Sequence, residues 1–239
     1  MAESFLKVSG VSKRFGGFTA LSDVTLDIAA GERFGLIGPN GSGKTTLINC
    51  VSGLLRNDSG SIVFAGEDIS RLPAYVRTRK GIARSFQVPR PFHTMTVLEN
   101  LLVPSAYVAH MKDVDGEARA IELLRGMGLA AKAQSFARDL SQVELRKLEL
   151  ARAMAAGPKL LISDEAMAGL AGNEVDDVLA ILFKLNEAGI TIIMIEHIMQ
   201  AVMRFSQRVV CLDAGRIICE GTPASIVQNP DVQKAYLGA

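Results

Sequence analysis

A glycine-rich segment near the start of the chain limits its possible folds more than any other feature. The eight residues Gly38-Pro39-Asn40-Gly41-Ser42-Gly43-Lys44-Thr45 match the pattern G-x-x-x-x-G-K-[ST] at every fixed position. An apolar run at 33–37 precedes the segment, and residues 44–52 have the pattern of a helix that Gly53 would end. A strand, a glycine loop and a helix in this order predict the beginning of an α/β sheet.

Each residue type in this segment suits the binding of a phosphate group. Glycines let consecutive backbone N–H groups point at phosphate oxygens, and the helix that begins near Lys44 directs its positive end at the same anion. Lys44 would reach the β- and γ-phosphates, and the Thr45 hydroxyl would bind Mg²⁺. We therefore predict that all eight residues, together with Thr46, bind a nucleotide. The segment alone does not indicate which enzyme.

Composition narrows the class of protein. The 239 residues include 26 Lys and Arg against 25 Asp and Glu, a net charge of +1, which argues against a chain held on nucleic acid by bulk charge. The apolar run at 190–195 is far shorter than the ~18 residues of a membrane span, and the first residues lack the pattern of a signal peptide. Three scattered cysteines are typical of thiols in a reducing cytosol. We expect a soluble intracellular protein, with any membrane role provided by a partner.

The first part of the chain predicts strands. Alternating apolar residues over the first thirty positions indicate short antiparallel strands, and glycines punctuate short strands and turns over 54–88. Residues 89–139 change in character: they contain three prolines and helical segments at 96–102 and 117–127. We interpret this stretch as the start of an inserted helical lobe.

The second part of the chain predicts a sheet covered on both faces. A long helix is expected from Ser141 to about residue 156, followed by a buried strand at 159–163. A helix at 174–187 separates this strand from another at 190–195, and alternation of this kind is typical of a parallel sheet. Residues 208–219 predict a hairpin around Asp213-Ala214-Gly215.

Three polar residues follow the two buried strands. Asp164 and Glu165 end the first, and His197 comes just after the second. Ligands bind at the carboxyl ends of parallel strands, so Asp164 is placed to hold Mg²⁺ through water and Glu165 to polarise an attacking water. His197 is placed to donate a hydrogen bond to a γ-phosphate. Without the glycine loop upstream, a solvated Asp-Glu turn and a structural histidine would explain these residues equally well.

Two further residues are candidates on weaker local grounds. Gln87, before the helical lobe, has an amide that could contact Mg²⁺ or the attacking water, or it is an ordinary polar loop residue. Phe15 could stack on adenine, and a place in the core is the alternative.

In order and spacing, this series resembles the ATP-binding subunit of ABC transporters over essentially the whole chain. The matching features are Phe15, the phosphate loop, Gln87, a Ser-led helix at Ser141, the Asp164-Glu165 pair and His197. The segments 83–92, 95–100 and 165–170 and the ending Ala235-Tyr236-Leu237-Gly238 look like the branched-chain amino acid uptake group. ATPases for urea, amides or lipopolysaccharide share many of these features and stay open as alternatives.

The resemblance implies an α/β fold: a P-loop NTPase core with a mostly parallel sheet, an N-terminal antiparallel β subdomain and an inserted helical subdomain. The chain would be one domain, 1–239, with its core at 1–88 and 157–239 and the helical subdomain at 89–156. The cofactors implied are ATP and Mg²⁺, the latter held by Thr45, Gln87 and Asp164. Glu165, His197 and Gln87 would be the catalytic residues.

The resemblance also implies partners. Two such subunits face each other head to tail, so each ATP lies between the phosphate loop of one and the Ser141 signature of the other. Gln87 and the helical subdomain would contact two membrane permease subunits, with a solute-binding protein acting indirectly and no nucleic acid involved. The chain would then lie on the cytoplasmic face of the inner or plasma membrane.

The signature departs from the family's Leu-Ser-Gly-Gly-Gln. Here it is Leu140-Ser141-Gln142-Val143-Glu144, with the serine kept and both glycines lost. Ser141 and Glu144 can still form a capping box, but two side chains and a carboxylate stand where backbone would approach phosphate. Because this chain's own phosphate site looks complete, we favour a heterodimer with a second ATPase that carries an intact signature. A homodimer with a competent variant signature is the alternative.

Three other functions compete with a transporter ATPase. A soluble ABC-type ATPase acting on nucleic acid or ribosomes would usually carry two ATPase units or long coiled-coil insertions. A nucleotide-binding regulator without turnover is disfavoured by Glu165. A small-molecule kinase would leave the Ser141 helix without a role.

Overall fold

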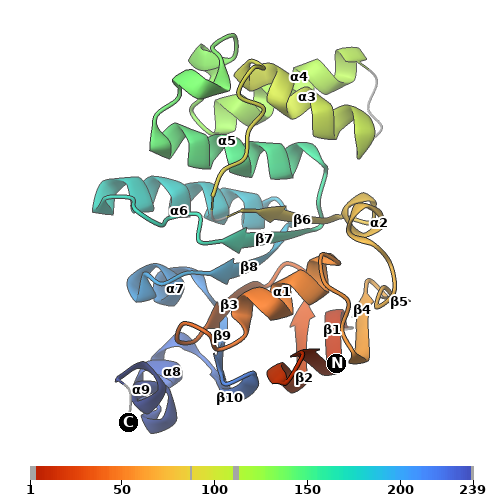
Figure 1. The fold of residues 1–239 in the computed structure, drawn as a ribbon. Helices are drawn as coiled ribbons and strands as arrows, with labels where there is room; N and C mark the ends of the chain where they lie inside the picture. Colours follow the sequence, from red (N-terminus) through yellow and green to blue (C-terminus); the bar gives the residue numbers. More distant parts are fainter. Residues whose placement is uncertain (1–3, 87, 110–112, 238–239) are drawn as a thin grey trace.

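The computed structural model describes residues 4–86, 88–109 and 113–237 (Figure 1). In chain order the elements are β1 (Ser4–Phe15), β2 (Phe18–Ala29), β3 (Arg33–Ile37), α1 (Lys44–Ser52), β4 (Ser59–Phe64), β5 (Glu67–Asp68), α2 (Ala74–Arg79), β6 (Ile82–Ser85), α3 (Val97–Tyr107), α4 (Asp113–Gly126), η1 (Ala130–Lys132), η2 (Ala137–Asp139), α5 (Gln142–Ala155), β7 (Leu160–Asp164), α6 (Gly172–Glu187), β8 (Thr191–Ile195), α7 (Met199–Phe205), β9 (Arg208–Asp213), β10 (Arg216–Gly221), α8 (Pro223–Gln228) and α9 (Pro230–Leu237).

The N-terminal strands form an antiparallel sheet in the order β2-β1-β4-β5. β1 pairs with β2 on one side and β4 on the other, and its buried residues Leu6, Val8 and Val11 lie in the core. The antiparallel pairing predicted for the first thirty residues is confirmed. The strands are longer than expected, because β1 and β2 each run for 12 residues around the turn at Gly16.

The second sheet has the order β10-β9-β3-β8-β7-β6. β9, β3, β8, β7 and β6 are parallel, and β10 pairs antiparallel with β9 at the edge as the predicted hairpin. Every residue of β7 and β8 is buried. A strand buried on both faces reads as a continuous apolar run, which is why the sequence predicted this sheet correctly.

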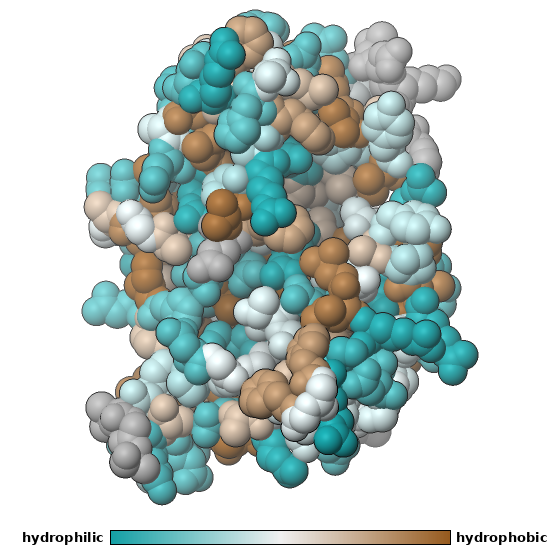
Figure 2. All heavy atoms as spheres, in the orientation of Figure 1, coloured by the Kyte–Doolittle hydropathy of each residue, from teal (hydrophilic) through white to brown (hydrophobic). Residues whose placement is uncertain are grey.

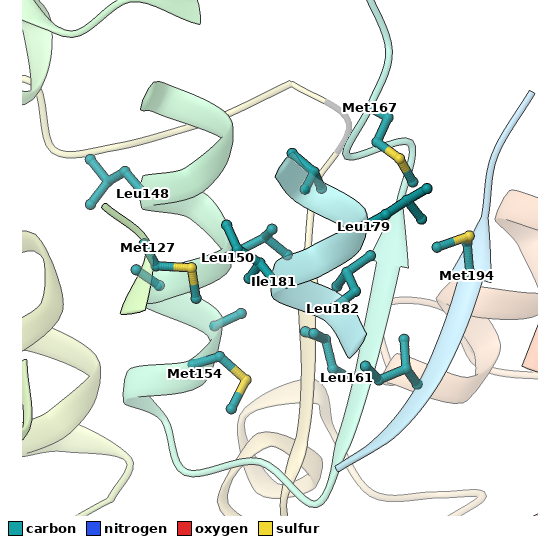
Figure 3. Packing of buried hydrophobic residues seen from close by; sticks show 14 of the residues in the cluster. Met127, Leu148, Leu150, Met154, Leu161, Met167, Leu179, Ile181, Leu182 and Met194 are labelled. Carbon is teal, nitrogen blue, oxygen red and sulfur yellow. The ribbon is translucent and has the colours of Figure 1, made fainter. Parts of the chain in front are cut away.

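Alternate residues of the central strands pack into two cores. In β7, Leu161 faces the helices α5 and α6, whereas Leu160 and Ile162 face α1 and the N-terminal sheet. Figure 3 shows Leu150 of α5 meeting Ile181 of α6, beside the residues that project from β7 and β8. The helices α3 to α5 form the upper layer in Figure 1, with α6 between them and the sheet. The Ser141 helix is thereby fixed relative to the strand ends.

The helix α2 was missed, since residues 54–88 were predicted as strands and turns only. It is a helix of six residues after Pro73, too short to show a clear period in sequence. Its stability comes from tertiary contact: the guanidinium of Arg77, 1% exposed, donates to the carbonyl oxygens of Cys50 (2.6 Å) and Val51 (2.9 Å) at the end of α1. No sequence pattern indicates that a buried arginine caps the helix of the phosphate loop.

The ends of α1 and α5 agree with the sequence. α1 ends at Gly53, whose φ of 81° is a left-handed conformation that favours glycine. α5 begins after Ser141, which forms the expected capping box with Glu144.

Hydrophobic and hydrophilic side chains are interspersed on the face of the molecule in Figure 2. Among the described residues, no helix combines the length and apolarity needed to cross a membrane.

Candidate functional site

The phosphate loop joins the end of β3 to α1 and is tightly enclosed by neighbouring backbone. A Cβ at Gly38 would overlap the carbonyl oxygen of Leu212 in β9, and one at Gly43 would lie 2.7 Å from the carbonyl oxygen of Ala20. Both glycines have positive φ, 146° and 107°. These two positions therefore need glycine for space and for backbone conformation.

Lys44 begins α1, and its side chain reaches back to the phosphate loop that precedes it. Its side-chain Nζ donates to the carbonyl oxygens of Gly38 (2.7 Å) and Pro39 (2.9 Å), and the residue is 6% exposed. Desolvation by burial lowers the pKa of Lys44, opposed chiefly by the nearby Glu165 carboxylate. Thr45, the next residue, is exposed, so its hydroxyl is accessible to a ligand.

A cavity of about 270 Å³ opens over the loop and gathers most of the predicted site. The predicted residues that line it are Phe15, Asn40, Gly41, Ser42, Gly43, Lys44, Thr45, Thr46, Glu165 and His197. Phe18 and Ala20 of β2 also line it and were not predicted. Phe15 and Phe18 are 47% and 63% exposed and pair across the β1–β2 turn. Two exposed aromatic rings at the mouth of a polar cavity suit the stacking of a flat base.

Glu165 and His197 come from different strand ends and meet in this cavity. Glu165 Oε1 lies 2.8 Å from His197 Nε2. The Glu165 side chain is 15% exposed and that of His197 46% exposed. The Glu165 backbone has a φ of 49°, and its N–H donates to the carbonyl oxygen of Ile195 in the next strand (2.9 Å). A non-glycine residue held in this strained region is characteristic of a functional site.

Asp164 is held by Arg84, a residue that the sequence did not indicate as part of the site. The Arg84 guanidinium of β6 donates to Asp164 Oδ2 (2.5 Å) and to Asn49 Oδ1 of α1 (2.6 Å). The side chains of Arg84 and Asp164 are 9% and 8% exposed. Arg84 thus links the strand of the acidic pair to the helix of the phosphate loop. Its position in the quoted segment 83–92 was noted, but no sequence pattern pairs it with an aspartate 80 residues later.

The turn after Glu165 is fixed by two charged residues. Glu196, 2% exposed, accepts a hydrogen bond from the Met167 N–H (2.8 Å). From α5, Arg146 donates to the Ala168 carbonyl oxygen (3.3 Å). Burial raises the pKa of Glu196 to about 7, and the charge of Glu165 adds to the shift. The turn therefore connects the catalytic candidates to the Ser141 helix.

The remaining predicted residues lie outside this cavity. Gly38 and Pro39 belong to the loop and accept bonds from Lys44, and Asp164 lies behind Glu165. Ser141 lies at the start of α5 and does not line the cavity, as expected of a residue predicted to act on a partner's nucleotide. Gln87 lies outside the described residues.

The residues present fit a nucleotide and Mg²⁺. Backbone N–H groups at the start of α1 and the Lys44 ammonium suit a polyphosphate. The Thr45 hydroxyl and the Asp164 carboxylate are hard oxygen donors of the kind that Mg²⁺ accepts. Over the described part of the chain, no three acidic, histidine or cysteine residues cluster as a metal site.

The fold and this cavity together define a P-loop nucleotide-binding protein. Comparison of the chain with known families narrows this class. The family model described as "ABC transporter" matches residues 21–168, and the model described as "Branched-chain amino acid ATP-binding cassette transporter" matches residues 216–239. The chain belongs to the ABC transporter family of ATP-binding proteins, which confirms the resemblance seen in the sequence.

Curated relatives are similar along their full length. The chain is 39% identical to the high-affinity branched-chain amino acid transport ATP-binding protein BraF of Pseudomonas aeruginosa, over 100% of this chain and 99% of BraF. It is 37% identical to LivG of Escherichia coli, with the same coverage. It is 35% identical to the lipopolysaccharide export ATP-binding protein LptB of Haemophilus influenzae, over 98% of each chain.

Solved structures confirm the fold. The ADP conformation of MJ1267, an ATP-binding cassette of an ABC transporter, matches with a TM-score of 0.91 at 31% identity, over 100% of both chains. The dimeric structure of the bacterial ABC transporter cassette MJ0796 matches with a TM-score of 0.83 at 27% identity, over 91% of this chain and 98% of that one.

Proposed function

We propose that this chain hydrolyses ATP to drive a membrane transporter that takes up branched-chain amino acids. The observation that carries the ATPase part is the 2.8 Å contact between Glu165 and His197 in the cavity over the phosphate loop. The substrate class is supported by the match of residues 216–239 and by the printed functions of BraF and LivG.

Each residue of the cavity has a separate role in hydrolysis. Lys44 and the loop N–H groups bind the phosphates, and Phe15 stacks on the base. Glu165 accepts a proton from the attacking water at a carboxylate oxygen, and His197 donates a hydrogen bond to the γ-phosphate. Thr45, Asp164 and Gln87 would hold Mg²⁺, which would neutralise charge on the phosphate oxygens.

A second ATPase completes the site by facing the cavity with its signature helix. In this chain, the corresponding Ser141 lies exposed at the start of α5. Glu144, whose charge would repel phosphate, is held aside: it accepts from the Ser141 N–H (2.9 Å) and pairs with Lys132 Nζ (2.6 Å). The hydrogen bond from Lys132 is also the chief cause of the lowered pKa of Glu144. These contacts keep the Glu144 carboxylate away from the start of the helix. Gln142 and Val143 still stand where the family has glycines. We therefore propose a heterodimer in which this chain supplies a complete nucleotide site and a weakened signature.

The membrane subunits dock beside the helical layer. A groove of about 330 Å³ lies between α3, α5 and β6, with exposed apolar side chains along it: Leu54, Phe86, Phe92 and Tyr107. Arg84 lines this groove and donates to Asp164, so a force at the groove would reach the nucleotide site. Under this proposal the chain lies on the cytoplasmic face of the membrane, residues 89–156 form the helical subdomain, and a solute-binding protein acts from the other side.

The experiment that tests the function is purification of the tagged chain from native membranes in mild detergent, followed by identification of its partners. Two membrane proteins with a second ATPase are the expected result. Membrane proteins with only copies of this chain would keep the transport function and contradict the heterodimer. Recovery alone or with ribosomes would contradict transport.

The substrate is tested by radiolabelled uptake in cells that lack the gene. Loss of leucine, isoleucine and valine uptake, restored by the wild-type chain but not by Lys44→Ala, is expected. Unchanged amino acid uptake with a defect in lipopolysaccharide export would favour the second candidate, a function like that of LptB.

A further inference from the structure

The C-terminal helix reaches the phosphate loop directly. α9 ends near Tyr236, whose hydroxyl oxygen accepts a hydrogen bond from the backbone N–H of Gly38 at 2.8 Å. The two residues are 198 positions apart in the chain. Gly38 is buried and is the first glycine of the phosphate loop, so this contact joins the end of the chain to the nucleotide site.

The position of Tyr236 is set by firm packing of the elements around α9. Asn229 Oδ1 accepts from the N–H groups of Asp231 (2.8 Å) and Val232 (3.3 Å) at the start of the helix. The amide of Asn229 also donates to Cys219 Sγ of β10 (3.1 Å). Val232 is 4% exposed and belongs to the main core. The Tyr236 ring is therefore carried by a helix that is tied to the edge of the parallel sheet.

Three contacts hold Gly38 in one conformation. Tyr236 accepts from its N–H, Lys44 Nζ donates to its carbonyl oxygen (2.7 Å), and the Leu212 carbonyl occupies the space beside its Cα. The Lys44 ammonium is also attracted by nucleotide phosphates, so a bound nucleotide competes with its contact to Gly38. The contact with Tyr236 joins the Gly38 N–H to a hydroxyl and does not involve the Lys44 side chain, so it does not depend on what Lys44 contacts.

We propose that Tyr236 is a positioning residue for nucleotide binding, and that the C-terminal segment 216–237 stabilises the phosphate loop through the Tyr236 hydroxyl. This inference rests on the proposed function, since it assumes that the loop binds ATP. Loss of the hydroxyl leaves a buried N–H without its acceptor, which lets the loop adopt conformations that do not bind phosphate. The effect falls on nucleotide affinity, because Tyr236 does not line the cavity where Glu165 and His197 lie.

The test is the Tyr236→Phe variant of the full chain, measured beside the wild type and Tyr75→Phe. The substitution keeps the ring and removes one oxygen atom. Tyr75 in α2 is 64% exposed and provides a matched loss of a hydroxyl away from the loop. Methylanthraniloyl-ATP is titrated into each protein, and steady-state hydrolysis and the Tm of the nucleotide-free protein are recorded.

The expected result is a five- to tenfold rise in the Kd and KM of Tyr236→Phe, about the worth of one hydrogen bond. The kcat at saturating ATP stays within error of the wild type, the nucleotide-free Tm falls by no more than about 2–4 °C, and Tyr75→Phe binds as the wild type does. An unchanged Kd would overturn the inference. A lower kcat or Tm with unchanged KM would show a merely structural role and would also overturn it.

The same titrations distinguish a failure of the proposed function from a failure of this inference. If the wild type does not bind the probe, or Lys44→Ala binds it equally well, the assignment of the loop fails. If the wild type binds, Lys44→Ala does not, and Tyr236→Phe binds as tightly as the wild type, only the role of Tyr236 fails.

Discussion

Glu165 Oε1 and His197 Nε2 lie 2.8 Å apart, although 32 residues separate them in sequence. Parallel pairing of β7 with β8 brings the two strand ends together, and the left-handed backbone of Glu165 turns its side chain into the cavity. A carboxylate oriented by an imidazole beside a phosphate loop has the geometry of a base that acts on water. Under the proposed function, hydrolysis would depend most on this pair.

We predict that Glu165→Gln retains ATP and loses hydrolysis. The amide keeps the shape of the side chain but cannot accept the proton of the attacking water. General-base catalysis contributes about 10²–10⁴-fold, so kcat should fall by at least about 10²-fold. Nucleotide affinity, measured by titration with methylanthraniloyl-ATP, should stay within about threefold of wild type, since Lys44 and the loop are untouched.

The matched control for this prediction is Glu187→Gln, which makes the same chemical change at the exposed end of α6. It should leave both kcat and affinity unchanged. Wild-type turnover by Glu165→Gln would show that another group accepts the proton, and our assignment of Glu165 would be wrong.

We predict that Arg84→Ala destabilises the protein strongly. Asp164 and Arg84 are both almost fully buried, and removal of one partner of a buried ion pair costs about 3–5 kcal/mol in free energy of unfolding. The double variant Arg84→Ala, Asp164→Asn should lose less than the sum of the single variants Arg84→Ala and Asp164→Asn, because no buried charge remains unpaired. Urea unfolding of all four proteins measures the coupling.

The pair Arg204–Asp176 serves as the control for burial. Its two side chains are 58% and 57% exposed. Solvent screening limits an exposed pair to about 0–1 kcal/mol, so Arg204→Ala should change the free energy of unfolding little. Equal losses at the buried and exposed pairs would contradict the role that we assign to Arg84.

The contrast between Lys44 and Arg84 shows how much of the site the sequence could predict. Lys44 belongs to a motif of fixed spacing whose chemistry follows from local backbone geometry, so it was found at once. Arg84 and Tyr236 act through partners 80 and 198 positions away, and such pairs exist only after the sheet has formed. Both lie in segments that resemble the branched-chain amino acid uptake group, but no local pattern indicates what either side chain contacts.

The fold likewise has elements that the sequence predicts and elements that it does not. Buried strands such as β7 and β8 carry continuous apolar runs, and α1 and α5 carry caps, so their sequences predict them. The six-residue helix α2 depends on the buried Arg77 and was missed. The helices α7, α8 and α9 were not predicted either, because they are six to eight residues long and too short for a clear period.

We predict that Glu196 makes the protein less stable as the pH rises from 4.5 to 7. Burial raises its pKa from 4.5 to about 7, so between these values the folded protein binds a proton that the unfolded chain has released. The free energy of unfolding contributed by this proton is present at pH 4.5 and is lost by pH 7. The whole difference is about 3 kcal/mol.

Urea unfolding of the wild type and Glu196→Gln at intervals from pH 5 to 8 tests this prediction. The glutamine keeps an acceptor for the Met167 N–H but has no proton to lose. The difference in stability between the two proteins should therefore change with pH up to about pH 7 and level off above that value. A constant difference would show that Glu196 does not titrate there.

We predict that the two nucleotide sites of the purified transporter contribute unequally to turnover. If this chain has a complete phosphate site and a weakened signature, Lys44→Ala should abolish most ATP hydrolysis, whereas Ser141→Ala should reduce it by less than about twofold. Loss of the helix cap costs about 1 kcal/mol whichever site is active, so Thr96→Ala in the equivalent capping box of α3 provides the control for stability. ATPase rates of the three variant complexes, each normalised to the amount of intact complex, give the comparison. An equally large loss with Ser141→Ala and Lys44→Ala, beyond that of Thr96→Ala, would mean that the signature is competent despite Gln142 and Val143, and the asymmetric heterodimer would have to be abandoned.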